Sequence, residues 1–158
     1  MPGVTQIGVA EAIDDSSLGK KVDRATSDVL TGSAVSIFTI SGGRVLLLGL
    51  IGEVTTVIGT GTTPEAKFQL NPTAGTTVDL CAALDLADDE VGTLYSITGT
   101  PGDAMLAGSS GAVRNMAAQG VVLDAGAIEF ICDENVSGSI SFQARYLPLD
   151  AGARLVAA

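Results

Sequence analysis

Apolar and polar residues alternate along most of the chain after residue 33, and short unbroken apolar runs lie between the alternating stretches. A period of two residues predicts β-strands, whose side chains point in turn to opposite faces of a sheet. The strongest signal covers residues 35–58, where two apolar runs flank the turn Ser41-Gly-Gly-Arg44. We interpret this segment as a β-hairpin that turns at the two glycines.

Six further segments have the same character, and glycine, proline or acidic residues separate them. They are residues 66–70, 76–84, 92–99, 120–123, 127–132 and 139–147. About eight short strands with turn signals between them predict a mainly β fold, an antiparallel β-sandwich or a jelly-roll-like barrel.

The large apolar residues of these strands define the expected hydrophobic core. In residues 139–147, for example, the alternation places every second residue from Ile140 to Tyr146 on one face. The residues that we expect to supply much of the core are Phe38, Leu46, Leu48, Phe68, Leu80, Ile97, Phe130, Phe142 and Tyr146.

The first 32 residues lack a sustained period, which divides the chain into an extended N-terminal arm, residues 1–32, and a β domain, residues 33–158. The arm has few large apolar residues, so it cannot bury enough surface alone to offset ~1–2 kcal/mol of backbone entropy per residue. We therefore expect it to become ordered against a partner, and we expect a chain without its first 30 residues to keep a folded core. The candidate contact residues are Val4, Ile7, Val9, Ile13, Leu18, Lys20, Lys21 and Arg24.

Composition limits the classes of partner. The formal charge of −10, from 18 acidic and 8 basic residues, disfavours nucleic-acid binding because it repels phosphate groups. No segment approaches the ~20 apolar residues of a membrane-spanning helix, and no export signal precedes the chain's first strands, which predicts synthesis in a cytoplasm. Yet 46% of the residues are apolar and only 16% are charged, so we expect apolar surface to be buried between subunits of a homo-oligomer.

The residue types that carry most enzyme chemistry are missing or wrongly spaced. Histidine is absent, which removes the usual general base and the commonest metal ligand. Cys81 and Cys132 lack the spacing of a zinc site, and we expect reduced, buried thiols, with a disulfide between them as the alternative. We expect no catalytic residue, no cofactor and no bound metal. One question stays open: the acidic segment 85–90 is either a solvated turn or a calcium site.

Five segments carry a resemblance to a known class of protein. They are Ile37–Ile40, Leu50–Ile58, Asn71–Cys81, Val91–Gly99 and Tyr146–Ala153. Together they resemble small virion proteins of tailed bacteriophages that are encoded among the head genes, over roughly residues 33–158. Such proteins are often capsid decoration, or cement, proteins. The resemblance implies a mainly β, homotrimeric structural protein that binds the major capsid protein on the outside of the phage head.

Three alternatives remain. A tail-tube or head–tail connector subunit is the first, although tube proteins usually need a long hairpin and a packed helix. A receptor-binding β-module of a phage fibre is the second, although it would need exposed aromatic residues, and the chain has no tryptophan, two tyrosines and four phenylalanines. An enzyme is the weakest alternative, since no acid–base pair is recognisable.

Overall fold

The structure is a computed structural model that describes residues 18–60, 63–109, 111–113 and 120–158. These ranges contain β-strands and no helix, so they hold no helix that could cross a membrane. The strands are β1 (Lys20–Ser27), β2 (Ala34–Ser41), β3 (Val45–Thr56), β4 (Glu65–Pro72), β5 (Val78–Asp79), β6 (Leu84–Asp85), β7 (Leu94–Ser96), β8 (Leu106–Gly108), β9 (Val121–Leu123), β10 (Gly126–Cys132), β11 (Ser139–Pro148) and β12 (Arg154–Ala157).

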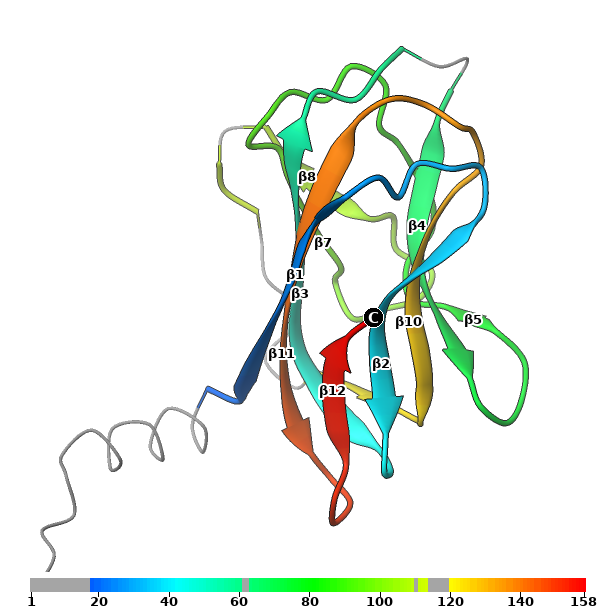
Figure 1. Ribbon diagram of the computed structural model, residues 1–158, viewed down its shortest axis with the longest axis vertical. Helices are drawn as coiled ribbons and strands as arrows, with labels where there is room; N and C mark the ends of the chain where they lie inside the picture. The colour runs from blue at the N-terminus through cyan, green and yellow to red at the C-terminus, as the bar shows by residue number, and fades with distance from the viewer. Residues whose placement is uncertain (1–17, 61–62, 110, 114–119) are drawn as a thin grey trace, which may run out of the picture.

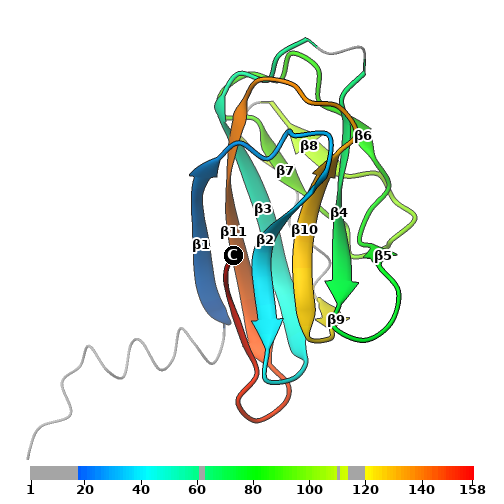
Figure 2. The ribbon, with the colours of Figure 1, turned by 45° about the vertical axis from the view of Figure 1, so that its right-hand side comes forward.

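Two antiparallel sheets make up the molecule. Sheet I has the strand order β1-β11-β3-β7-β8, and β9 also pairs with β3. Sheet II has the order β12-β2-β10-β4-β5, and β6 also pairs with β4. Figure 1 shows the sheets face to face, and Figure 2 shows β1 at one margin of the sandwich and β5 at the other. The predicted antiparallel β-sandwich is confirmed.

The core lies between the two sheets, where the alternation of each strand places its apolar residues. Every second residue of β11 from Ile140 to Tyr146 is buried, as predicted. The ring of Phe142 meets Phe68 and Phe130 of sheet II at centroid distances of 6.1 and 5.5 Å, within the range of favourable aromatic pairs. The predicted core residues that are buried are Phe38, Phe68, Leu80, Ile97, Phe130, Phe142 and Tyr146.

The prediction is wrong for Leu46 and Leu48, which are only half-buried. Leu46 lies on the outer face of sheet I, and its neighbours Val45 and Leu47 are completely buried instead. The pairing of β3 with β11 shifts at Leu48, since Tyr146 faces Leu47 whereas Arg145 faces Gly49. This bulge moves the buried positions of β3 from odd-numbered residues before it to even-numbered residues after it.

The predicted hairpin at residues 35–58 is also wrong. β2 pairs with β10 and β12, whereas β3 pairs with β11, β7 and β9, so the two strands lie in different sheets. The segment between them is a corner that passes from sheet II to sheet I. Gly42 has φ 79° there, and a Cβ on it would lie 2.3 Å from the carbonyl oxygen of Gly152. Two apolar strands that face each other across a core bury as much surface as two that pair edge to edge, so hydrophobicity alone does not separate these arrangements.

The predicted boundary of the arm at residue 32 is wrong as well. β1 pairs with β11 from Lys20 opposite Tyr146 to Ser27 opposite Ile140, so it is a member of sheet I. Val29 and Leu30 follow β1 and are completely buried. An edge strand has one neighbour and a solvated outer face, so it needs few apolar residues and its sequence resembles a polar linker. Residues 1–17 of the predicted arm lie outside the described residues.

Candidate docking surfaces

β1 carries three candidate contact residues, Lys20, Lys21 and Arg24, and a fourth, Leu18, lies two residues before it. β1 is the first strand of sheet I and pairs on one side only, with β11. Its other edge presents unpaired backbone N–H and C=O groups, which can accept a further strand. The remaining candidates, Val4, Ile7, Val9 and Ile13, lie outside the described residues.

The three basic residues of this strand differ in their surroundings. Lys20 is exposed and makes no ion pair with the described residues. The ammonium group of Lys21 lies 2.9 Å from a carboxylate oxygen of Asp23. The Arg24 guanidinium lies 5.9 Å from the ring centroid of Phe142 and donates a hydrogen bond to the Ser27 hydroxyl, and burial lowers its pKa. Lys20 is therefore the basic side chain most available to a partner, and Arg24 contributes mainly to its own domain.

The outer face of sheet I is apolar in the half where β3 begins. Leu46 of β3 and Leu147 of β11 are cross-strand neighbours there, and both are half-buried. Val122 of β9 pairs with Leu46 on its other side and is 55% exposed. We call the surface formed by Leu46, Val122 and Leu147 the apolar patch.

The other half of the same face is hollowed and polar. A hollow of about 770 Å³ lies over β1, β11 and β3. The bulge in β1 between Arg24 and Ser27 borders it. We call it the acidic hollow, because Asp23 and Glu53 bring its carboxylates. Its lining residues are Asp23, Arg24, Ala25, Thr26, Ile51, Glu53, Ser141, Phe142 and Gln143.

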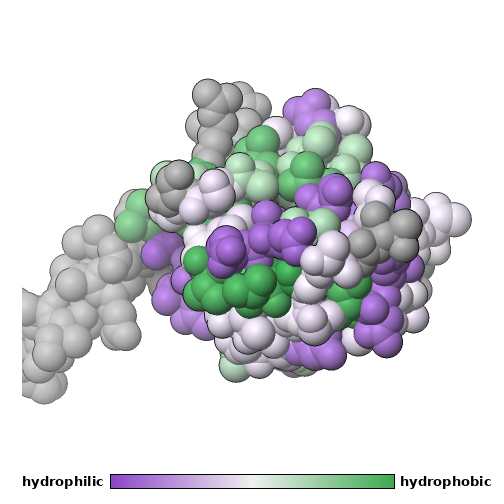
Figure 3. Space-filling view, turned by 90° about the horizontal axis from the view of Figure 1, so that it is seen from above, coloured by the Kyte–Doolittle hydropathy of each residue, from purple (hydrophilic) through white to green (hydrophobic). Residues whose placement is uncertain are grey.

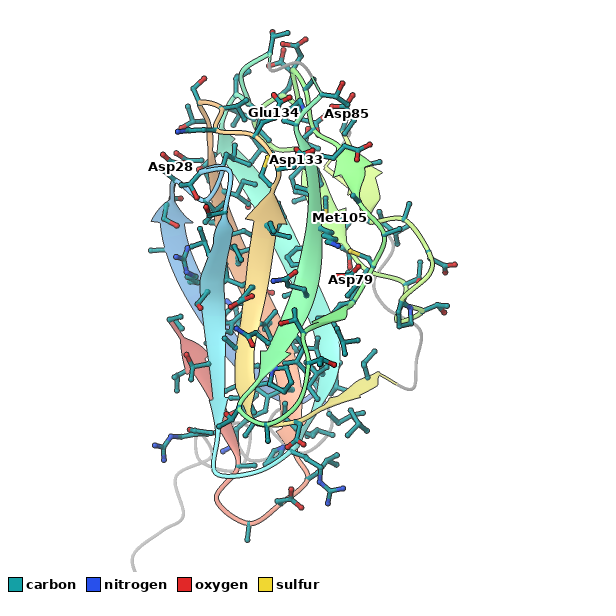
Figure 4. The ribbon with its side chains drawn as sticks, turned by 90° about the vertical axis from the view of Figure 1, so that its right-hand side faces the viewer. Asp28, Asp79, Asp85, Met105, Asp133 and Glu134 are labelled. Atoms are coloured by element: carbon teal, nitrogen blue, oxygen red, sulfur yellow. The ribbon has the colours of Figure 1, made fainter. Side chains whose placement is uncertain are left out.

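Carboxylates gather at the end of the sandwich where β1 and β10 finish. Asp28, Asp85, Asp133 and Glu134 lie there together in Figure 4. Four segments meet at this end, residues 28–33, 57–60 with 63–64, 84–92 and 133–138, and they contain seven acidic residues and no lysine or arginine. Seen from this end, hydrophilic residues lie beside apolar ones (Figure 3). Val57 and Val91 belong to the same segments of the chain and have exposed side chains.

Three carboxylates of the acidic segment 85–90 already have partners. Asp85 accepts a hydrogen bond from the Ala87 N–H at 2.9 Å. Asp88 accepts a hydrogen bond from the Thr60 hydroxyl at 2.5 Å. Asp89 accepts one from the buried Tyr95 hydroxyl at 2.5 Å, and burial raises the pKa of Asp89. Among the described residues no group of three or more acidic or cysteine side chains is arranged to hold a metal ion. What this end supplies is a concentration of negative charge beside the acidic hollow.

Apart from Arg24, the residues that line the hollow were not predicted, because no sequence motif marks them. The sequence contains one indication of this surface, which is Glu53. It is the only charged residue between Arg44 and Glu65, and it lies inside a long apolar strand. A lone carboxylate in such a strand must reach the outer face of its sheet, because burial without a partner is costly. Ser141 and Gln143 alternate with core residues of β11 in the same way and gave no separate signal.

Comparison with protein-family models, curated proteins and solved structures finds no match to this chain.

Proposed function

We propose that this protein is a structural virion protein, a capsid decoration or cement protein that binds the major capsid protein on the outside of a tailed-phage head and stabilises the shell. Its location would be the head exterior, after synthesis in the host cytoplasm, and it would act as a homotrimer. The resemblance of residues 33–158 to small head proteins of tailed phages is the reason that this proposal names a phage capsid.

The observation that carries an assembly role is the outer face of sheet I. The apolar patch lies on the solvent side of that sheet, and among the described residues no second layer covers it. Exposed apolar area of this kind usually marks a protein–protein interface. We assign the apolar patch to contacts between copies of the chain, where it would be buried in the assembled oligomer.

The free edge of β1 supports attachment to a second protein. Strand addition along such an edge supplies main-chain hydrogen bonds without a preformed pocket. Lys20 stands at the start of this edge, exposed and available for a carboxylate of the partner. Three such edges in one trimer would bind a shell cooperatively, because each attachment raises the effective concentration of the next.

The proposal is tested by mixing purified protein with expanded, empty heads that were assembled without it, and with unexpanded proheads as the control. Sedimentation of the particles separates bound from free protein. We expect saturable binding to expanded heads, at a number of copies set by the lattice of the shell. The absence of binding to expanded heads would overturn the proposal, and binding to tail tubes, to isolated connectors or to host cells instead would point to one of the alternatives.

A further inference from the structure

The acidic hollow has a regular arrangement of side chains across three strands. Asp23 of β1, Gln143 of β11 and Ile51 of β3 face one another in one row. Ser141 and Glu53 form the next row. From strand spacing and rise, the Cα atoms of Asp23 and Glu53 are about 12 Å apart across the face.

The charges in the hollow are incompletely neutralised. Glu53 is exposed and has no hydrogen-bond or ion-pair partner among the described residues. Asp23 accepts hydrogen bonds from Lys21 and Gln143, and the lysine lowers the pKa of Asp23. The basic residue in the lining, Arg24, interacts with Phe142 and Ser27 instead. Arg145 also lies close enough to Asp23 to lower its pKa, so the charge without a partner in the hollow is that of Glu53. The acid-rich segments at the same end of the sandwich add negative potential to it.

The shape and the chemistry select one kind of occupant. The two rows run across the strands, and the hollow borders the free edge of β1, so an extended polypeptide can lie over it. In an extended segment, side chains on one face repeat about every 7 Å, so basic residues two or four positions apart can reach both carboxylates. Ile51 offers an apolar contact between them, and Ser141 offers a hydroxyl for hydrogen bonding.

We infer that the acidic hollow binds an extended segment of the shell subunit that carries lysine or arginine side chains, with Glu53 as its main ionic contact. This inference rests on the proposed function and deepens it, since it names the chemistry of the partner. Electrostatic complementarity of this kind sets the specificity and the association rate of an interface.

The test compares Glu53→Lys with Glu65→Lys in the binding assay on expanded heads. Glu65 is a matched control because it is also an exposed strand carboxylate without a side-chain partner among the described residues, but lies in sheet II. We expect Glu53→Lys to weaken binding at least tenfold and to reduce its dependence on salt. We expect Glu65→Lys to bind within about twofold of the natural protein. The isosteric pair Glu53→Gln and Glu65→Gln repeats the comparison without a new positive charge, in case Glu53→Lys fails to fold.

A second measurement identifies the contact directly. Carbodiimide cross-linking of decorated heads joins carboxylates to nearby lysines, and mass spectrometry should find Glu53 or Asp23 joined to a lysine of the shell subunit. If the natural protein decorates heads and the Glu53 variants bind equally well, this inference is wrong and the proposed function stands. Equal weakening by the Glu53 and Glu65 variants would also overturn the inference, because the overall negative charge of the protein, and not a contact in the hollow, would then explain the binding. If Glu53→Lys changes only the oligomeric state of the free protein, the hollow binds a second copy and the inference fails.

Discussion

Arg44 and Asp150 join two of the corners at which the chain passes between the sheets. Arg44 precedes β3, and Asp150 lies between β11 and β12. The Nε and Nη2 atoms of Arg44 donate to the two carboxylate oxygens of Asp150 at 3.0 and 2.9 Å. The backbone N–H of Arg44 donates to the same carboxylate at 2.8 Å. One carboxylate thus joins both corners, and it adds to the backbone hydrogen bond that the Leu149 N–H donates to the Arg44 carbonyl oxygen at 3.0 Å.

Replacement of Asp150 by asparagine should destabilise the protein at neutral pH and have less effect in acid. The hydrogen bond from Arg44 lowers the pKa of Asp150 to about 2, from an ordinary value of 3.8. A carboxylate with a depressed pKa in the folded state contributes stability above its unfolded pKa and loses it as the pH falls toward the folded value. The effect should be small because both side chains are partly exposed. Thermal unfolding of the two proteins across this pH range measures it.

The control for this experiment is Glu65→Gln, which removes an exposed carboxylate without a side-chain partner among the described residues. It should leave the unfolding midpoint close to that of the natural protein at every pH. A constant difference between Asp150→Asn and the natural protein from neutral pH down to pH 2 would show that the ion pair does not stabilise the corners.

The sequence predicted the faces of the strands much better than the arrangement of the strands. Phe68 and Phe142 were assigned correctly to the core because period-two alternation states which side of a strand is buried. The same pattern does not say which strand is the neighbour, and so residues 35–58 were read as a hairpin. Pairing depends on contacts between residues that are distant in sequence, such as Ile128 with Phe38 and with Leu70.

The candidate site was predictable only in part, for a related reason. Leu18 and Lys20 were named as contact residues, and the structure places them beside a free strand edge. The apolar patch was hidden because the bulge at Leu48 reverses the inward and outward positions of β3, and a bulge has no reliable sequence signal when the extra residue is a leucine. The acidic hollow was hidden because its residues come from three strands that only the fold brings together.

Both cysteines should be unreactive in the native protein. Cys81 and Cys132 are free thiols and buried. Burial raises the pKa of the Cys81 thiol to about 11, and burial also raises the pKa of Cys132. At pH 8 the Cys81 thiol is therefore about one part in a thousand thiolate, which is the reactive form. A disulfide-exchange dye at pH 8 should therefore detect no thiol in the folded protein and two thiols after unfolding in guanidinium. Rapid reaction of either thiol in the folded protein would contradict the placement of that cysteine in the core.

The apolar patch can be tested as the contact between copies. We expect the natural protein to sediment as a trimer and Val122→Glu to shift it toward smaller species, since burial of a valine contributes about 1.5–3 kcal/mol and a buried glutamate opposes association. The matched control is Val78→Glu, because Val78 is 49% exposed on β5 of sheet II. Analytical ultracentrifugation over a range of concentrations distinguishes the two variants. A monomeric natural protein, or equal sedimentation of Val122→Glu and the natural protein, would exclude this surface as the contact.

Two truncations separate the attachment role of the N-terminal residues from their role in the fold. Removal of residues 1–17 should leave the unfolding transition unchanged, because it removes none of the strands of the sandwich. Removal of residues 1–30 takes away β1, which covers the edge of β11, together with the buried Val29 and Leu30. Loss of one large buried side chain costs about 2–5 kcal/mol, and a domain has only about 5–15 kcal/mol of total stability. The longer truncation should therefore fail to fold cooperatively, contrary to the expectation from the sequence. Circular dichroism on heating measures both.

In the binding assay with expanded heads, the shorter truncation should bind more weakly than the full chain while keeping its fold. Undiminished binding by that truncation would show that residues 1–17 make no contact with the shell, and would leave the edge of β1 and the acidic hollow as the surfaces through which attachment must occur.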